Sequence, residues 1–201
     1  IELQTEVSAI EKRGEIFRVT LKRGEREQLL DAKRVILAIG DMHHPRLLGV
    51  PGESLPHVSH YLREPHSYFH QDVVVVGGKN SAVEATIRLE RVGARVTLVY
   101  RGTALDQKRI KYWLYPELLY LIRNKKITLH LETEVEEIRS GEVVLRSKKN
   151  ENSHVEHVRC KADLVLLLTG YEQVKTLFET LGLTPEGEGQ QPALRADTME
   201  S

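Results

Sequence analysis

Residues 72–102 read DVVVVGGKNSAVEATIRLERVGARVTLVYRG, and this stretch decides how the fold is interpreted. Its four consecutive valines suit a strand buried on both faces of a parallel sheet, and Gly77 and Gly78 follow at once. From Ala82 the apolar residues recur at helical spacing, until Gly93 ends the helix and a second apolar strand begins. A β-α-β unit with glycines at its first turn predicts a dinucleotide-binding fold.

The glycine turn has the chemistry that a pyrophosphate requires. Gly77 allows a tight turn, and the helix that follows supplies free N–H groups and the positive end of its dipole. Asn80 and Ser81 are suited to capping that helix. In the pattern G-x-G-x-x-[GA] the middle glycine is replaced by Lys79, whose charge can cover the phosphates but whose Cβ denies the closest backbone approach. Ala82 lets the helix pack near the strand; the alternative is a glycine-rich corner of some other α/β fold.

The end of the second strand bears on which cofactor binds. NAD sites usually place Asp or Glu there, and this chain has Tyr100 and Arg101 instead. Arg101 can bind a 2′-phosphate through its planar guanidinium, and Tyr100 can stack on the adenine, so the sequence favours NADP(H) over NAD(H). The alternative is an arginine that is merely solvated. Lys108, Arg109 and Lys111 follow in the same loop and either add charge to the site or face water.

Composition limits the function classes. The chain has 201 residues, enough for one core or for one domain with pieces of another. Lys+Arg and Asp+Glu both number 29, so net charge gives no reason to expect binding to nucleic acid or an acidic membrane. No apolar run approaches the ~18 residues of a membrane span. The single cysteine, Cys160, fits a reducing cytoplasm and is expected to be a small buried hydrophobe rather than a reactive thiol.

The remaining elements follow from periodicity. Residues 2–10 and 16–22 predict a hairpin with one wet face, and a strand is expected at Arg34–Ile39. The His- and Pro-rich residues 41–71 predict a connector with short helical turns. Five more strands are expected, at Ile127–Leu131, Glu134–Ile138, Glu142–Arg146, Val155–Cys160 and Asp163–Leu168, with a polar hairpin tip at 147–157 and a frayed region from Thr184 onward.

One further helix and two side-chain clusters are predicted. Residues 112–122 form a short apolar helix in which Pro116 either causes a kink or marks the first turn of a second helix. Tyr112, Trp113 and Tyr115 are expected in the core or at a domain interface rather than as a platform for nucleic-acid bases, because the net charge is zero and no basic groove is evident. The histidines of the connector are interpreted as surface and loop-packing residues, and no metal site is predicted, because no cysteine or acid stands at metal-ligand spacing.

Six stretches carry a family resemblance: LAIG, LGVPGE, VVVVGGKNSAVEA, GARVTLVYRG, IKYWL and LLLTGY. In this order they resemble the middle and C-terminal portion of flavin-dependent, thioredoxin-reductase-like oxidoreductases. GGKNSAVEA and IKYWL are specific to the YpdA-type branch, the bacillithiol disulfide reductases, and the match covers nearly all of residues 35–201. The resemblance implies an α/β fold, with a Rossmann-like parallel sheet, helices and an added antiparallel β-meander, in a truncated FAD/NAD(P)-binding arrangement.

The resemblance also implies a division of the chain and a set of binding residues. Residues 1–43 would end a first FAD-domain segment, 44–168 would bind NADP(H), and 169–201 would begin a second FAD-domain segment. Glu84 is placed near the nicotinamide, or else is an exposed helix carboxylate. The complete set of cofactor-binding candidates is Gly77, Gly78, Lys79, Asn80, Ser81 and Ala82 at the pyrophosphate, Glu84, Tyr100, Arg101 and Lys111, and Thr169 and Gly170 at a second strand end.

Two departures from thioredoxin reductases limit what is expected. The N-terminal FAD fingerprint does not occur in these residues, and the chain begins without Met, so we expect a fragment that does not hold FAD tightly. Where thioredoxin reductases carry C-x-x-C, residues 59–66 read SHYLREPH. Without cysteine, thiolate attack on a disulfide from this domain is excluded, as in the YpdA-type branch. No acid, base or nucleophile is assigned within the chain.

The function expected from this resemblance is hydride delivery from NADPH to FAD, for reduction of a low-molecular-weight disulfide. One alternative is an NADP(H)-binding module without catalysis of its own. Another is a flavin monooxygenase-like enzyme, although that family's own motifs do not occur in the sequence. The expected partners are NADPH and a small-molecule or protein disulfide or other electron acceptor, with neither nucleic acid nor membrane. The expected location is the cytoplasm, and a homodimer is compatible with the sequence.

Overall fold

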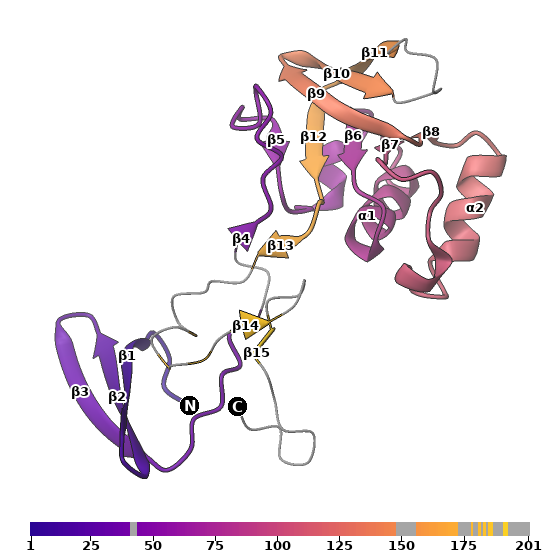
Figure 1. Cartoon of the computed structure of the whole chain (residues 1–201). Coiled ribbons are helices and arrows are strands. Elements are labelled where there is room, and N and C mark those ends of the chain that lie inside the picture. Colours follow the sequence, from indigo (N-terminus) through magenta and orange to yellow (C-terminus); the bar gives the residue numbers. More distant parts are fainter. Residues whose placement is uncertain are drawn as a thin grey trace. The chain divides into compact units, whose positions relative to one another are not determined.

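The computed structural model describes residues 1–40, 44–147 and 156–172, together with 178, 181, 183, 185–186 and 191–192. The chain divides into two compact units. Unit 1 comprises Ile1–His44 and Glu172–Ser201, and unit 2 comprises Pro45–Tyr171. Figure 1 labels the elements of both units.

Unit 1 contains an antiparallel sheet of order β1-β2-β3. β1 (Glu6–Arg13) and β2 (Ile16–Arg23) form the predicted hairpin, in which the register partners Ile10 and Val19 are buried. β3 (Arg26–Ala32) pairs with β2 although most of its residues are exposed, so its sequence carries little of the alternation that marks a half-buried strand. Two short strands, β14 (Pro185–Glu186) and β15 (Gln191–Pro192), form a separate antiparallel pair.

The strand predicted at Arg34–Ile39 is wrong. Residues 34–39 have no strand conformation, and the sheet β1-β2-β3 does not include them. Ile36 is 91% exposed. β-branched residues favour a strand only where a neighbouring strand completes their backbone hydrogen bonds, and this segment does not join the sheet of its unit.

Unit 2 is built on a parallel sheet of order β5-β12-β6-β7-β8, which confirms the predicted α/β class. β5 and the 3₁₀ helix η1 (Pro65–Tyr68) lie inside the His-rich connector, where the sequence predicts only helical turns. A two-residue strand is too short to show a periodic pattern. The strands are β5 (Val58–Ser59), β6 (Asp72–Val76), β7 (Arg95–Val99), β8 (Thr128–His130) and β12 (Leu164–Leu167).

Two helices cover one face of this sheet. α1 (Asn80–Arg91) links β6 to β7 and completes the predicted β-α-β unit. α2 (Tyr115–Arg123) packs beside α1, and Pro116 lies in its first turn, which decides between the two roles considered for this proline. Within the described residues no helix has the length and apolarity needed to cross a membrane. One core cluster joins the helices to the sheet, and it includes Val73, Val75, Val83, Ile87, Leu89, Leu98, Leu118 and Leu121.

An antiparallel meander covers the other face. Val74 and Val76 belong to a second core cluster with residues of the meander, whereas Val73 and Val75 belong to the helix-side cluster. Successive side chains of a strand point to opposite faces, so the run of valines requires cover on both sides. Unit 2 therefore has three layers (Figure 1). The meander strands, in the order β11-β10-β9, are β9 (Thr133–Arg139), β10 (Gly141–Ser147) and β11 (Glu156–Ala162).

The topology brings two strand ends together. β6 and β12 are neighbours, but β6 continues through α1 to β7, whereas β12 continues into β13 (Tyr171–Glu172). β4 (His44–Pro45) is the segment by which the chain enters unit 2. Neighbouring parallel strands whose onward connections diverge make a topological switch point, where open α/β sheets bind ligands. The carboxyl ends of β6 and β12 are therefore the expected place for a ligand.

Two expectations fall mainly outside the described residues. The polar hairpin tip predicted at 147–157 includes residues 148–155, of which the structure describes none. The region from Thr184 onward is described only at β14 and β15.

Candidate functional site

Gly77 makes the turn from β6 into α1, and its position admits no side chain. Its φ is +146°. Its amide donates to the carbonyl of Val99 (2.9 Å), and the amide of Leu168 donates to the carbonyl of Val76 (2.8 Å). A Cβ at Gly77 would lie 2.5 Å from the carbonyl oxygen of Leu168 and 2.8 Å from Cβ of Ala82. The neighbouring strand and the helix thus both require glycine here.

Gly78 and Gly102 hold the ring of Tyr100. A Cβ on either glycine would overlap that ring. The amide of Tyr100 donates to the carbonyl of His130 (2.8 Å), and its carbonyl accepts from the amide of Thr133 (3.2 Å), so its backbone is fixed between β8 and β9. The half-buried ring therefore reaches across from the end of β7 to the glycine turn. Gly78 is thus needed for close packing against a side chain as well as for any ligand.

The N-terminus of α1 keeps its anion-binding character. Lys79 is the N-cap residue, with extended backbone angles, and its side chain forms no capping hydrogen bond. Asn80 and Ser81 are the first helical residues, so the predicted capping role is wrong: the glycine turn places the extended residue one position earlier. The first turn contains no acidic residue. Uncapped N–H groups at the positive end of a helix dipole bind phosphate well.

Asn80 has a different task from the one predicted. Its Oδ1 accepts a hydrogen bond from the amide of Lys111 (2.7 Å), across 31 positions of sequence. The loop after β7 is therefore tied to the start of α1, and Lys111 stands beside the candidate phosphate site. Ser81 is exposed at that site, and Ala82 is fully buried against Gly77.

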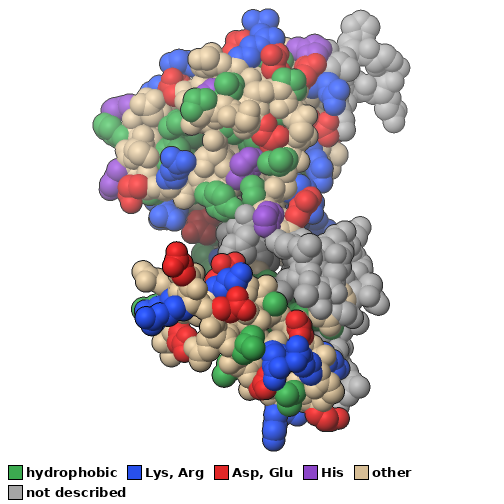
Figure 2. All heavy atoms as spheres, turned by 90° about the vertical axis from the view of Figure 1, so that its left-hand side faces the viewer, with side chains coloured by type: hydrophobic (Ala, Val, Ile, Leu, Met, Phe, Trp, Pro, Cys, Tyr) green, Lys and Arg blue, Asp and Glu red, His purple; other side chains and the backbone are tan. Residues whose placement is uncertain are grey.

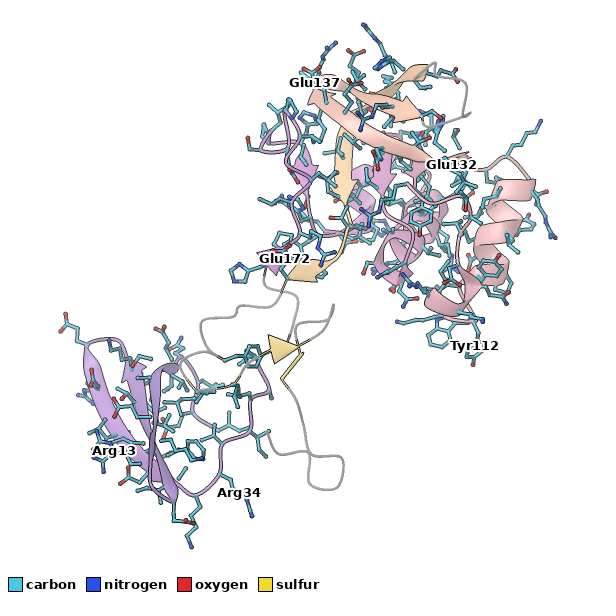
Figure 3. All side chains as sticks on the ribbon, viewed as in Figure 1. Arg13, Arg34, Tyr112, Glu132, Glu137 and Glu172 are labelled. Carbon is cyan, nitrogen blue, oxygen red and sulfur yellow. The ribbon has the colours of Figure 1, made fainter. Side chains whose placement is uncertain are left out.

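Arg101 is exposed at the end of β7, where the sequence places the 2′-phosphate ligand. Among the described residues its side chain forms no hydrogen bond and no ion pair. The next residue, Gly102, accepts a hydrogen bond from the amide of Glu132 (3.0 Å), so the backbone beside Arg101 is held in place. Glu132 itself lies just past β8 (Figure 3). An uncommitted guanidinium on a fixed backbone suits the capture of a phosphate.

Three candidates have less direct support. Glu84 is half-exposed and lies 3.9 Å from Arg88 one helical turn on, an arrangement that an exposed helix carboxylate also shows. Thr169 donates its hydroxyl to the carbonyl of Arg46 (2.7 Å), which occupies that hydrogen. Gly170 has a φ of +103° and accepts from the amide of Arg46 (3.0 Å), so it shapes the exit of the chain from β12. Thr169 and Gly170 follow β12 and Glu84 lies in α1, but none of the three shows a group reserved for a ligand.

The structure adds a pair that sequence reasoning missed, His60 and Glu53. Glu53 accepts hydrogen bonds from the amides of Leu48 (2.9 Å) and Gly49 (2.7 Å), and its Oε1 lies 3.9 Å from Nε2 of His60. Nδ1 of His60 is buried without a partner among the described residues. His60 follows β5, so it lies at the same carboxyl edge of the sheet as Gly77. The only sequence signal was its place in the segment where thioredoxin reductases carry cysteines.

Cys160 and the histidines do not form a reactive or metal centre in the part of the chain that the structure describes. Burial raises the pKa of the Cys160 thiol, which disfavours the thiolate. Its Sγ lies 3.9 Å from Nε2 of His130. No group of three His, Cys, Asp or Glu side chains in the described ranges is arranged to hold a metal ion. On the face of the molecule that Figure 2 shows, cationic and anionic side chains are interspersed.

Comparisons with known proteins agree on one kind of enzyme. The family model described as pyridine nucleotide-disulphide oxidoreductase matches residues 1–201. The chain is 42% identical over 166 residues to bacilliredoxin reductase Bdr of Bacillus subtilis, an alignment that covers 83% of this chain and 49% of that protein. The chain thus spans about half the length of that relative.

Solved structures give the same picture. Bacillithiol disulfide reductase Bdr (YpdA) from Bacillus cereus superposes with a TM-score of 0.86 at 36% identity, over 98% of this chain and 59% of that one. Lactococcus lactis thioredoxin reductase gives a TM-score of 0.70 at 25% identity, over 90% of this chain and 57% of that one. The resemblance to YpdA-type, thioredoxin-reductase-like proteins is confirmed.

Proposed function

The chain belongs to the pyridine nucleotide-disulphide oxidoreductase family, and on that premise we propose that unit 2 is the NADPH-binding part of a flavin-dependent disulfide reductase. NADPH supplies a hydride when bound, and FAD accepts it. A low-molecular-weight disulfide is the proposed final acceptor, which the similarity to bacilliredoxin and bacillithiol disulfide reductases supports. The residues of this chain bind and orient the dinucleotide, and none of them is assigned as acid, base or nucleophile.

The glycine turn carries this proposal. A Cβ at Gly77 would overlap with Leu168 and Ala82. Three backbone segments therefore approach one another closely at the switch point. The N-terminus of α1, uncapped and without acidic residues, follows directly. Such a cradle fits a pyrophosphate, which Lys79, Asn80 and Ser81 would surround.

We assign the adenosine end to Tyr100 and Arg101. NADPH and NADH differ there by one phosphate, and Arg101 is a cation without an ion pair among the described residues. Lys111 is a second cation of the same loop, and its amide is held by Asn80. This arrangement favours the doubly charged 2′-phosphate of NADPH and gives NADH nothing equivalent.

The division of labour between segments is part of the proposal. Residues 44–168 would bind NADP(H), and residues 1–43 and 169–201 would belong to the FAD-binding domain. The match of the family model to residues 1–201, rather than to unit 2 alone, supports a role for both units in one enzyme.

Replacing Arg101 tests the cofactor assignment. In Arg101→Ala the dissociation constant for NADPH should rise about 10- to 100-fold, because charge-assisted hydrogen bonds to the 2′-phosphate are lost. The constant for NADH should stay nearly unchanged. Isothermal titration calorimetry of both nucleotides measures this difference.

Arg123→Ala provides the matched control, since Arg123 is also exposed but lies in the last turn of α2. It should bind NADPH as tightly as the unchanged chain. NADH binding as tight as NADPH in the unchanged chain would contradict the role of Arg101.

A further inference from the structure

Of the three predicted core or interface aromatics, Tyr115 packs against the core, whereas the two side chains before α2 are exposed, so a place in the core is wrong for those two. Tyr112 is 80% exposed and Trp113 is 56% exposed. Their rings meet edge to face with centroids 4.9 Å apart, and Nζ of Lys111 lies 5.5 Å from the centroid of Trp113. Figure 3 shows Tyr112 projecting outward from the molecule. We call residues 111–113 the aromatic segment.

The aromatic segment is fixed at both ends. Ile110, which precedes it, is buried in the helix-side core. The carbonyl of Lys111 accepts hydrogen bonds from the amides of Leu114 (2.9 Å) and Tyr115 (3.4 Å), which lead into α2. Exposed rings on an anchored backbone lose little conformational freedom when they bind a partner, so they suit recognition.

The same segment is joined to the candidate phosphate site. The amide of Lys111 donates to Oδ1 of Asn80 (2.7 Å), and Asn80 is the first residue of α1. Two positions earlier, Gly78 packs against the ring of Tyr100. A short series of contacts therefore leads from Tyr100, at the end of β7, to the aromatic segment.

A flat ring beside a cation, in a segment whose backbone is hydrogen-bonded to the first residue of α1, matches one ligand chemistry: a planar base linked to phosphates. We propose that the aromatic segment is a second wall of the nucleotide site, on which the adenine of NADPH stacks against Trp113 while Lys111 faces its phosphates. This inference rests on the proposed function and extends it to residues that the glycine pattern does not include. Adenine is favoured over nicotinamide because Tyr100 and Arg101, assigned to the adenosine end, begin the same loop.

Trp113 is the only tryptophan of the chain, so its fluorescence reports on this wall directly. Titration with adenosine 2′,5′-bisphosphate, which has the adenine and the 2′-phosphate but no nicotinamide, should quench that fluorescence. Nicotinamide mononucleotide at the same concentrations should leave it unchanged. In Trp113→Ala the dissociation constant of the bisphosphate should rise about tenfold, the size of effect that loss of base stacking produces.

Two further variants complete the design. Trp113→Phe keeps a flat ring and should retain most of the affinity, which separates stacking from damage to the fold. Tyr120→Ala removes an equally exposed ring, 58% exposed, from α2 and should bind like the unchanged chain. Circular dichroism confirms that each variant is folded.

The outcomes distinguish this inference from the proposed function. If NADPH binds the unchanged chain and Trp113→Ala equally well, without change in Trp113 fluorescence, the inference is overturned while NADPH binding stands. Quenching by nicotinamide mononucleotide instead of the bisphosphate overturns the choice of adenine. Failure of the unchanged chain to bind NADPH at all overturns both proposals.

Discussion

Gly77 is the residue on which the candidate site depends most directly. The sequence pattern calls for glycine here because a tight turn is needed. The structure shows a further reason, since the carbonyl of Leu168, 91 positions away in the chain, lies where a Cβ would be. The turn is therefore packed directly against the end of β12.

We predict that Gly77→Ala lowers the free energy of unfolding by about 2 kcal/mol or more, because close overlap adds to an unfavourable φ. NADPH binding should be lost with it. Urea unfolding and calorimetric titration measure the two effects.

Gly141→Ala is the matched control for this change. Gly141 also has a positive φ, +83°, but a Cβ there would have no atom within 4 Å. Gly141→Ala should lower the free energy of unfolding by about 1 kcal/mol, because of the unfavourable φ alone, and should leave NADPH binding intact. Equal destabilisation by the two variants would show that the close approach at Gly77 does not matter.

At the residue scale, sequence reasoning proposes roles that depend on neighbours in the chain. Gly77, Lys79 and Arg101 were located by their spacing from the two strands. The hydrogen bond that Asn80 accepts from Lys111 and the burial of Nδ1 of His60 were missed, because both depend on residues that only the folded chain brings together.

At the scale of elements, Asp72 joins three strands. It is the first residue of β6, and its carboxylate accepts from Nε (2.6 Å) and Nη2 (2.9 Å) of Arg95 at the start of β7. Nζ of Lys161, in β11, lies 2.7 Å away. Hydrogen bonding to Arg95 holds the pKa of the Asp72 carboxyl well below its ordinary value, although partial burial opposes this. The sheet and the meander are thus linked at the end opposite the candidate site.

We predict that Asp72→Asn destabilises the chain at pH 7, by about 2 kcal/mol, the scale of hydrogen bonds to charged groups. Because the pKa is lower in the folded state, the stabilisation is fully present above the unfolded pKa of about 4 and declines as pH falls toward the folded pKa. The difference between the two proteins should therefore shrink below about pH 4. Thermal melts between pH 7 and pH 3 measure it.

Asp31→Asn is the control at this scale. Asp31 pairs with Arg18 through two hydrogen bonds of 2.8 Å, but the pair lies on an exposed sheet in unit 1. Water screens such a pair, so its loss should shift the melting temperature less than loss of Asp72. A larger shift for Asp31→Asn would contradict the role given to Asp72.

Elements were predictable where burial imposed a period. The valines of β6 and the amphipathic α1 were located correctly, since the core clusters on both faces of the sheet require those residues. Arg34–Ile39 shows the limit of the same rule: an apolar run does not become a strand unless a partner strand pairs with it.

At the scale of the whole molecule, the two units should respond differently to nucleotide. At a concentration 100 times its dissociation constant, NADPH should raise the free energy of any local unfolding that destroys its site by about 2.7 kcal/mol. Hydrogen exchange should therefore slow in unit 2, most at residues 77–83 and 100–102. The amides of β1, β2 and β3 should exchange as before.

Mass spectrometry of exchanged peptides checks this expectation. Adenosine without phosphates serves as the control ligand and should protect neither unit. Equal protection of β1–β3 and of the glycine turn by NADPH would contradict the assignment of the dinucleotide to unit 2.

The sequence by itself determined the β-α-β unit, the glycine turn, the preference for NADPH as a prediction and the resemblance to YpdA-type reductases. These features follow from the handedness of the backbone, from the periodic spacing of buried residues and from residues that are close together in the chain. Only the tertiary structure decided that β12 lies beside β6, that the ring of Tyr100 rests on Gly78 and Gly102, and that Asn80 holds the loop bearing Trp113. Apart from the contact of Tyr100 with Gly102, these contacts join residues between 22 and 91 positions apart, so they exist only once the strand order and the layers of unit 2 have formed.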